Sequence, residues 1–347
     1  MKNGLPPPEI RGVPDFLWRA SGWDARVPSP WSTGRVAESV HNVYSAPMSP
    51  LLEAKGLTKH YGDTVALDGV DFRIDEGITG LLGPNGAGKS TAIKLFLGLL
   101  KPTGGSAEVM GERPYERLES RARLGYMPEH ECLPPNMSAS EFLIHMAQVS
   151  GIPPAQARTR TADILRHVGM DEERYRPIGG YSTGMQQRVK LAQALVHDPV
   201  LVMLDEATAG LDPSGREEML ELIRRTGRDF GISIVLSSHL MRDVESTCNR
   251  LVVLEGGQVM AQGTVSEFTE ETQVLAIDVD EAHKELVVAL KARGVDAKLE
   301  ELTVVVEHAT TEQYDSIREA LVESNAPLRR LSQRRRHLTD IFRNSDQ

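Results

Sequence analysis

The distribution of apolar and polar residues divides the chain into three stretches, with changes near positions 48 and 271. In the middle stretch, short apolar runs bounded by turn residues predict strands over 51–62 and 65–77. The run "GITGLLG" at 77–83 is apolar throughout and ends in glycine, which is typical of a strand buried on both faces. The middle stretch therefore begins as a sheet.

Apolar residues at helical spacing follow this strand. They predict a helix over 90–100, whose buried face holds Ile93, Phe96, Leu97 and Leu100. The region 138–196 is predicted to be mainly helical, and Ser138 with Glu141 forms a capping box at its start.

Apolar runs return farther along and indicate a parallel sheet. The segments 200–207 and 232–239 are continuously apolar, as strands are when helices cover both faces of a sheet. The segment 250–263 is predicted to be a closing hairpin. Strands and helices thus share the region 48–270, which indicates the α/β class.

The outer stretches differ from the middle. Residues 1–47 are rich in Pro, Gly and Ser, and we interpret them as a poorly ordered extension; a translation start at Met48 is the alternative. Residues 271–347 show the order strand, helix, strand, helix, which predicts a small accessory α/β domain of ferredoxin-like type. Its predicted segments are 273–280, 282–293, 302–308 and 311–324.

Composition narrows the function classes. Of the 347 residues, 40% are hydrophobic, which allows a large core, and the net charge of −10 argues against general nucleic-acid binding. Cys132 and Cys248 are far apart in the sequence, so a reducing cytoplasmic setting is expected rather than a disulfide framework. No apolar run reaches the ~20 residues that cross a bilayer. Any membrane part is therefore expected to come from a partner.

The segment "GPNGAGKST" at 83–91 matches the phosphate-binding pattern G-x-x-x-x-G-K-[ST] between a predicted strand and a predicted helix. Glycines let backbone N–H groups face a polyphosphate, and the helix dipole adds to their attraction. Lys89 supplies a positive charge for the β and γ phosphates, and the Ser90 hydroxyl is suited to hold Mg²⁺. The residues expected to contact ATP here are Gly83, Asn85, Gly86, Ala87, Gly88, Lys89, Ser90 and Thr91.

A pair of carboxylates completes this chemistry. Asp205 and Glu206 end the apolar strand predicted at 200–207. In a P-loop fold the first would hold Mg²⁺, and the second is suited to orient or deprotonate the attacking water.

The motifs "GPNGAGKST", "GYMPEH", "YSTGMQQR", "LVMLDEATAGLDP" and "SSH" occur in an order that resembles the ATP-binding-cassette (ABC) ATPases, over about residues 50–268. The resemblance implies a P-loop NTPase core with an antiparallel β subdomain and a helical signature subdomain. It also implies ATP hydrolysis by head-to-tail pairs, in which the signature loop of one subunit covers nucleotide on the other.

By the same resemblance, "YSTGMQQR" at 181–188 is the signature motif, whose common form is L-S-G-G-Q. Ser182 and Gly184 match that form, whereas Thr183 and Met185 depart from it. The Ser182 hydroxyl and the N–H groups of Thr183 and Gly184 would contact the partner's γ-phosphate, helped by the helix that follows.

Other positions are assigned by matching. Tyr61 resembles the aromatic residue that stacks on adenine, with Val65 nearby, although simple strand packing is an alternative for Tyr61. His239 resembles the switch histidine near the γ-phosphate, and Asp212 the aspartate of the loop that crosses the dimer interface. Glu129 stands where the family usually has a metal-sensing glutamine, and it could reach Mg²⁺ through water.

The signature, Glu129 and the C-terminal stretch together resemble the ATPase subunits of type-2 exporters. The ending at 334–342 is similar to theirs, or is a solvated charged face. The resemblance implies a homodimer or pseudo-dimer that binds a separate multi-span permease, on the inner face of the cell membrane, through a groove near 129–141. A non-transport ABC ATPase acting on ribosomes or DNA is the alternative, and the single cassette and acidic balance weigh against it.

Overall fold

The computed structural model describes residues 50–269, 271–306 and 313–335. The predicted extension at 1–47 and the last residues of the exporter-like ending, 336–342, lie outside them. Within the described residues, no helix is both long and apolar enough to cross a membrane.

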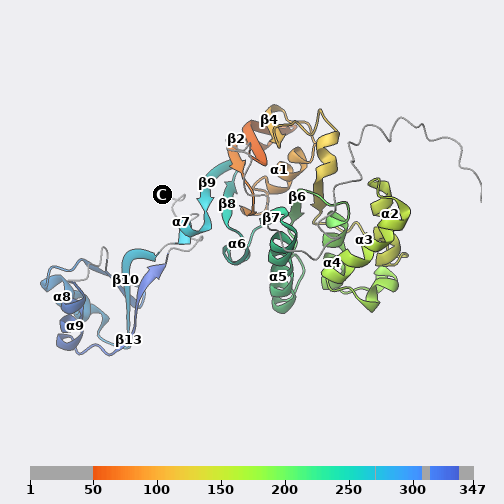
Figure 1. The fold of residues 1–347 in the computed structure, drawn as a ribbon. Helices are drawn as coiled ribbons and strands as arrows, with labels where there is room; N and C mark the ends of the chain where they lie inside the picture. The colour runs from red at the N-terminus through yellow and green to blue at the C-terminus, as the bar shows by residue number, and fades with distance from the viewer. Residues whose placement is uncertain (1–49, 270, 307–312, 336–347) are drawn as a thin grey trace, which may run out of the picture. The chain divides into compact units, whose positions relative to one another are not determined.

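Six strands of the described part form the central sheet, in the order β5-β6-β7-β3-β8-β9 (Figure 1). The first five are mutually parallel, and β9 pairs antiparallel with β8 as the predicted hairpin. The bounds are β3 Ile78–Leu82, β5 Leu124–Met127, β6 Leu201–Asp205, β7 Ser233–Ser238, β8 Arg250–Glu255 and β9 Gln258–Thr264. All residues of β3, β6 and β7 are buried, which accounts for their apolar runs. The polar residues of these strands are buried with them, namely Thr79, Asp205, Ser233, Ser237 and Ser238.

The register of the central strands brings their carboxyl ends together. Leu82 at the end of β3 is paired with Ser238 of β7, and Asp205 at the end of β6 is paired with Ser237. Neighbouring strands lie about 4.8 Å apart. Residues that follow these three strands are therefore within side-chain reach of one another.

A second, antiparallel sheet has the order β2-β1-β4, with bounds β1 Leu52–Tyr61, β2 Thr64–Ile74 and β4 Gly104–Val109. One hydrophobic core joins residues of this sheet, of helix α1 (Lys89–Phe96) and of the central sheet. Phe72 and Phe96 meet edge to face in it, with ring centroids 5.6 Å apart. The burial of α1 fixes the loop that precedes it.

Helix α1 is shorter than the predicted 90–100. It ends at Phe96, because Gly98 turns the chain with a φ of +64° and packs too closely on Pro114 for a side chain. Leu97 is still buried, and Leu100 packs against the core from the turn after the helix. The apolar spacing was correct for burial and wrong for the helix end.

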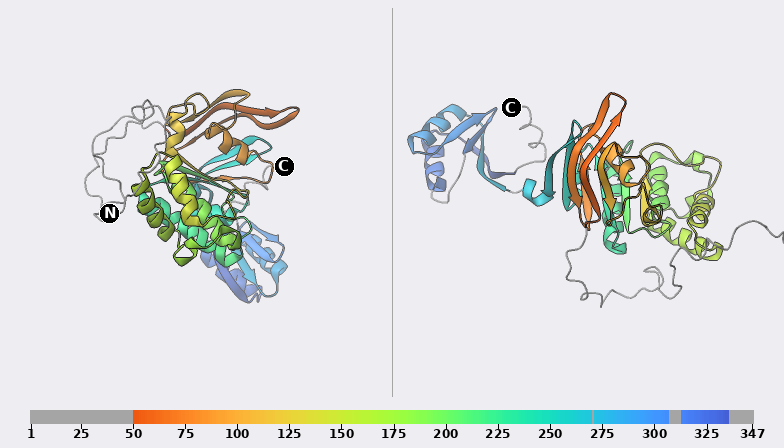
Figure 2. Two further views of the ribbon diagram at one scale, coloured as in Figure 1. Left: turned by 90° about the vertical axis from the view of Figure 1, so that its right-hand side faces the viewer. Right: turned by 90° about the horizontal axis from the view of Figure 1, so that it is seen from above.

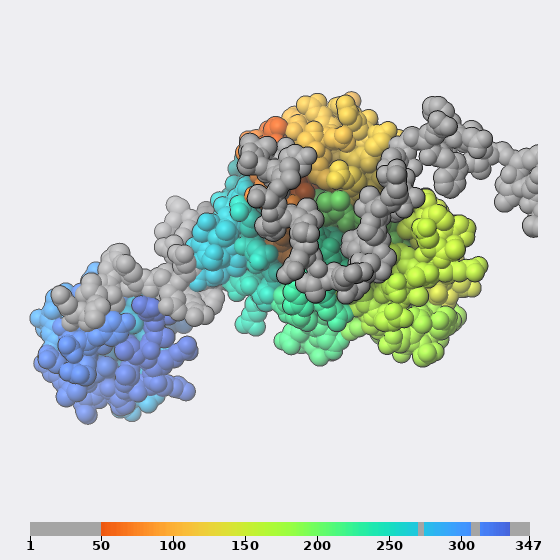
Figure 3. Space-filling model, viewed as in Figure 1, coloured from red at the N-terminus to blue at the C-terminus, as the bar shows by residue number. Residues whose placement is uncertain are grey.

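The predicted helical region contains α2 (Ala139–Val149), α3 (Pro154–His167) and α4 (Thr183–Leu195). Helices α2 and α3 lie to one side of the central sheet, and α4 packs against both them and strand β5 (Figures 2 and 3). Both bonds of the Ser138–Glu141 capping box are present. Short 3₁₀ turns at Glu119–Arg123, Glu172–Tyr175 and Ile178–Gly180 complete the connections. Helices α5 (Pro213–Phe230), α6 (Met241–Thr247) and α7 (Val265–Thr269) follow the later strands.

The C-terminal stretch contains two strands that the sequence analysis missed, β11 (Ala297–Glu300) and β13 (Leu328–Arg335). With β10 (Glu271–Val279) and β12 (Thr303–Val306) they form an antiparallel sheet in the order β11-β12-β10-β13. Helices α8 (His283–Ala292) and α9 (Gln313–Glu323) pack in its hydrophobic core. The order is thus βαββαβ, the ferredoxin-like arrangement, rather than βαβα. The missed strands are short or strongly charged, so they lack the apolar alternation of a strand.

We predict that His167 makes stability depend on pH. Its Nε2 lies 2.9 Å from the buried Thr226 hydroxyl on α5, and burial lowers the pKa of His167 from 6.5 to about 4. Below pH 6.5 the unfolded chain therefore binds a proton that the folded chain excludes, so this contribution to stability is lost as pH falls from 6.5 toward 4. Urea unfolding followed by circular dichroism at pH 7 and pH 5 measures it.

The control for this prediction is His167→Gln, which cannot titrate. Its urea midpoint should fall less between pH 7 and pH 5 than that of the wild type. Equal losses in the two proteins would show that His167 does not contribute.

Candidate functional site

The loop between β3 and α1 is held too tightly for side chains at two of its glycines. A Cβ on Gly88 would lie 2.6 Å from the Ala66 carbonyl oxygen, and one on Gly83 would lie 2.2 Å from that of Leu254. Gly88 also has a φ of 104°, which an L-residue rarely adopts. The loop therefore curls against β2 and β8, and only Pro84, Asn85 and Gly86 at its tip are exposed.

Lys89 begins α1 and is almost fully buried. Its Nζ donates hydrogen bonds to the carbonyl oxygens of Gly83 (2.7 Å) and Pro84 (3.1 Å) and lies 3.5 Å from Glu206 Oε1. The backbone carbonyl oxygens of the loop thus hold the Lys89 ammonium group. A bound phosphate would offer its own oxygens to the same group.

Asp205 lies at the end of β6, two strands from β3, and its carboxylate joins two serines. Its Oδ1 accepts hydrogen bonds from the hydroxyls of Ser90 (3.1 Å) and Ser237 (2.7 Å). Ser237 in turn accepts a bond from the backbone N–H of Glu206 at 3.0 Å. The paired hydroxyl and carboxylate of Ser90 and Asp205 are hard oxygen ligands of the kind that Mg²⁺ takes, so they fit such an ion.

Glu206 has an unusual backbone. In an extended strand, Asp205 and Glu206 would point to opposite faces. Glu206 instead has a φ of +50°, the left-handed region, and its carboxylate turns back toward Lys89. Such a conformation costs roughly 1–2 kcal/mol, and it brings both carboxylates to one site.

His239 follows β7 and contacts the same carboxylate, with Nδ1 2.9 Å from Glu206 Oε2. An ionised carboxylate only accepts hydrogen bonds, so this contact assigns the hydrogen to Nδ1. The Glu206 side chain is 8% exposed and that of His239 is 44% exposed. The site thus opens toward solvent at the histidine.

Glu129 is near this group but is not bonded to it. Its carbonyl oxygen accepts a bond from the buried Lys190 Nζ at 2.8 Å, and within the described residues its exposed carboxylate has no hydrogen-bond partner. Burial lowers the pKa of Lys190, and burial followed by the charge of Asp205 raises the pKa of Tyr126 to about 12. The sequence analysis missed Lys190, because a lysine in a helix is usually exposed.

Tyr61 and Val65 flank the turn between β1 and β2 and are 46% and 47% exposed. Lys59 Nζ lies 5.1 Å from the centroid of the Tyr61 ring. Since Val65 precedes Ala66, which contacts Gly88, this hairpin borders the phosphate-binding loop. An exposed ring at that border is available for stacking.

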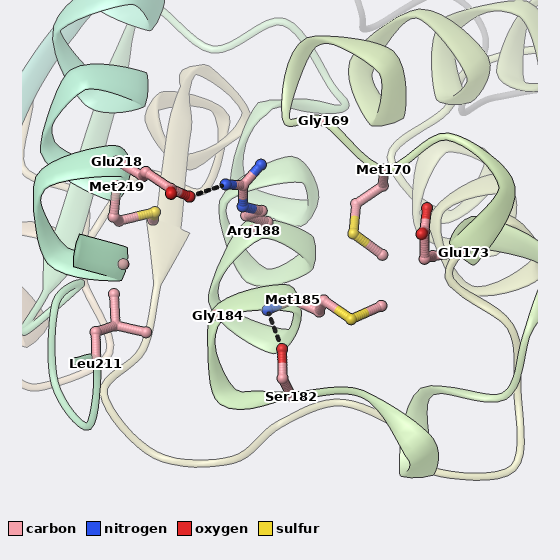
Figure 4. A pocket seen from close by; sticks show the side chains of 11 residues that line it. Gly169, Met170, Glu173, Ser182, Gly184, Met185, Arg188, Leu211, Glu218 and Met219 are labelled. Atoms are coloured by element: carbon pink, nitrogen blue, oxygen red, sulfur yellow. Dashed lines mark hydrogen bonds and ion pairs between the residues drawn. The ribbon is translucent and has the colours of Figure 1, made fainter.

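The signature residues gather on other elements. Ser182 caps α4 by accepting a bond from the Met185 N–H (Figure 4). Asp212 caps α5 by accepting one from the Gly215 N–H. Thr183 packs near Gly210, and Gly184 near Leu211. Beside Ser182 is a cavity of about 250 Å³, lined in part by Met170, Met185 and Met219. No hydrogen bond or ion pair in the described part joins Ser182 directly to Lys89.

A comparison with known sequences decides the family. The sequence profile described as "ABC transporter" matches residues 67–209. The chain is 35% identical to the uncharacterized ABC transporter ATP-binding protein YxlF of Bacillus subtilis (strain 168), over 67% of this chain and 77% of that protein. The chain belongs to the ABC transporter ATP-binding protein family. The P-loop fold and the ATPase activity expected from the resemblance are thereby confirmed.

Other ABC proteins are similar to this chain as well. The Nod factor export ATP-binding protein I of Ralstonia nicotianae is 34% identical over 70% of this chain and 75% of its own length. The daunorubicin/doxorubicin resistance ATP-binding protein DrrA of Streptomyces peucetius is 34% identical over 62% of this chain and 66% of its own length. A solved ATP-binding subunit of an ABC transporter has a TM-score of 0.56 and 32% identity, covering 63% of this chain and 91% of that one. The role of each site residue stays a prediction.

We predict that Ser237, which the sequence analysis did not single out, supports the carboxylates of this ABC ATPase. Ser237→Ala would leave Asp205 and the Glu206 N–H each without one partner. We expect the free energy of unfolding to fall by about 1–3 kcal/mol and the kcat for ATP to fall by about tenfold. Urea unfolding and steady-state ATP hydrolysis measure the two effects.

Ser233→Ala on the same strand is the matched control. Ser233 bonds the Gly77 N–H at the opposite strand end, so its loss should affect stability without lowering kcat. If the two variants had the same kcat, the proposed support by Ser237 would be wrong.

Proposed function

We propose that this chain is the ATP-hydrolysing subunit of an ABC exporter, and that it works as a pair of cassettes with a separate membrane protein. The observation that carries the proposal is the convergence of Lys89, Asp205, Glu206 and His239 at adjacent strand ends. A regulatory subunit that only binds ATP would not need these groups together.

ATP binding is assigned to the loop and its border. The backbone of 83–91 and Lys89 would receive the phosphates, and Tyr61 with Val65 would border the base. Lys89 would exchange the carbonyl oxygens of Gly83 and Pro84 for phosphate oxygens. Ser90 and Asp205 would hold Mg²⁺, with the Glu129 carboxylate reaching it through water. The ion would supply charge neutralisation for the phosphates.

Hydrolysis is assigned to Glu206. Its carboxylate lies between the lysine that would face the phosphates and the open histidine, where a water can enter. Glu206 would orient this water or take its proton, and His239 would hold the carboxylate in place through Nδ1.

We infer a second cassette because the signature loop presents Ser182, Thr183 and Gly184 at the start of α4, and no hydrogen bond in the described part joins Ser182 to the chain's own lysine. A helix N-terminus attracts phosphate. Two copies placed head to tail would let each signature loop cover the other's nucleotide, with Asp212 on the loop between them.

The exporter assignment is supported by relatives named for Nod factor export and for daunorubicin/doxorubicin resistance. We infer a multi-span permease as partner and a peripheral place on the inner face of the cell membrane. The segment 129–141, which leads from Glu129 to the capped start of α2, is the proposed contact for the permease. We assign the ATPase domain to 48–270 and an accessory domain to 271–347.

We predict that Glu206→Gln binds ATP, forms a stable ATP-bound dimer and loses at least about 100-fold in kcat, because an amide is a poor base. Size-exclusion chromatography with ATP and steady-state hydrolysis measure these effects. Normal hydrolysis by this variant would exclude Glu206 as the base.

A mixture of two variants tests the pairing. Ser182→Ala impairs the signature loop that would cover the partner's nucleotide. Glu206→Gln removes the base that would act on the chain's own nucleotide. A mixed dimer should therefore keep one site without either lesion. Activity of the mixture that never exceeds that of the separate variants would contradict the head-to-tail arrangement.

The membrane partner is tested by purifying the tagged chain from solubilised native membranes. We expect one multi-span membrane protein in near-equal amount, retained by the wild type and reduced by the charge reversal Glu131→Lys in the proposed contact segment. Glu245→Lys, an acidic position on α6, is the control. Recovery of ribosomal proteins instead would favour the non-transport alternative.

A further inference from the structure

The loop at 207–212 joins the catalytic strand end to the helix capped by Asp212. Two backbone bonds fold it into consecutive turns, from the Ala209 N–H to Glu206 O and from the Leu211 N–H to Thr208 O. The first turn is closed on the Glu206 carbonyl, and the loop ends at Asp212, the cap of α5.

Gln187 on α4 binds this loop from one side. Its Nε2 donates a hydrogen bond of 3.1 Å to the carbonyl oxygen of Ala209. Gln187 is buried, with 6% of its surface exposed. Helix α4 is also the helix capped by Ser182, so the bond links the signature helix to the loop after Glu206.

Asp243 on α6 binds the loop from the other side. Its Oδ2 accepts a 2.7 Å hydrogen bond from the Thr208 hydroxyl, and both residues are buried. Helix α6 begins two residues after His239, the contact of Glu206. The loop is thus fastened to the elements that carry both halves of the proposed mechanism.

We propose that Gln187 is a positioning residue for ATP hydrolysis, which holds the signature helix in register with the Glu206 carboxylate through the Ala209 carbonyl. Because of this bond, the signature loop and the Glu206 carboxylate of one chain move together, although they act on two different nucleotides. This inference rests on the proposed roles of Ser182 and Glu206.

The burial of Gln187 supports a functional reason for its amide. Its Oε1 is buried, and among the described residues it has no hydrogen-bond partner. A buried acceptor without a partner opposes folding, and an apolar side chain of similar length would avoid that cost. Folding alone therefore does not favour glutamine here, whereas a requirement for the donor on Ala209 does.

The test is Gln187→Met in the full chain, which keeps the side-chain length and removes both the donor and the unpaired acceptor. We expect a melting temperature close to that of the wild type, because the loss of the bond to the half-buried Ala209 and the removal of the unpaired Oε1 have opposite effects on stability. We also expect a KM for ATP within about threefold of wild type and a kcat about tenfold lower, the rate equivalent of one hydrogen bond. Gln193→Met, the same change farther along α4, is the control and should keep its kcat.

A double variant tests the shared path through the loop. Thr208→Val removes the hydroxyl that binds Asp243, and Thr208→Ser keeps it and should keep kcat. If both residues act through one loop, Gln187→Met with Thr208→Val should lose less activity than the product of the single losses.

Three results would overturn the proposal. The first is a kcat of Gln187→Met within about twofold of wild type, a change too small for a lost hydrogen bond. The second is a Gln187→Met protein that melts earlier or fails to fold, because this would make the amide structural. The third is a double variant whose loss of activity equals the product of the two single losses, because this would mean that Gln187 and Thr208 act independently of each other. Failure of the Ser182 and Glu206 mixture would instead reject the pairing itself.

Discussion

The structure depends on the placement of the Lys89 ammonium group, which is buried at the carboxyl ends of the parallel strands. A buried charge is costly unless charged or polar partners surround it, and here the partners come from the loop's own carbonyls and from Glu206. The alignment of β3, β6 and β7 provides these partners, since it sets their ends side by side. The tight glycines and the left-handed turn at Glu206 follow from that arrangement.

The proposed site has two halves, and one chain carries both of them. One half consists of residues at strand ends, and the other consists of residues at helix starts, where Ser182 and Asp212 are caps. The short loop between Glu206 and Asp212 belongs to both halves, and buried side chains bind it from α4 and from α6. The loop is therefore held by one side-chain hydrogen bond from α4 and one from α6.

Glu129, the departure from the usual motif, is tolerated for a local reason. Its backbone is fixed by Lys190, while its carboxylate faces solvent, so the extra negative charge is not buried. The negative charges of Glu129 and Asp205 raise the pKa of Lys190 and so oppose its lowering by burial.

The sequence alone determined the elements and the chemistry that depend on local pattern. These were the buried parallel strands, the capping box at Ser138, the phosphate-binding loop and the carboxylates at 205 and 206. It missed the end of α1, the strands β11 and β13, and the partners Ser237, Lys190 and Gln187. These features depend on contacts between residues far apart in the chain, such as Gly98 on Pro114 and Gln187 on Ala209. Only the tertiary structure decided that Asp205 and Glu206 face one site, because the turn at Glu206 reverses the alternation of a strand.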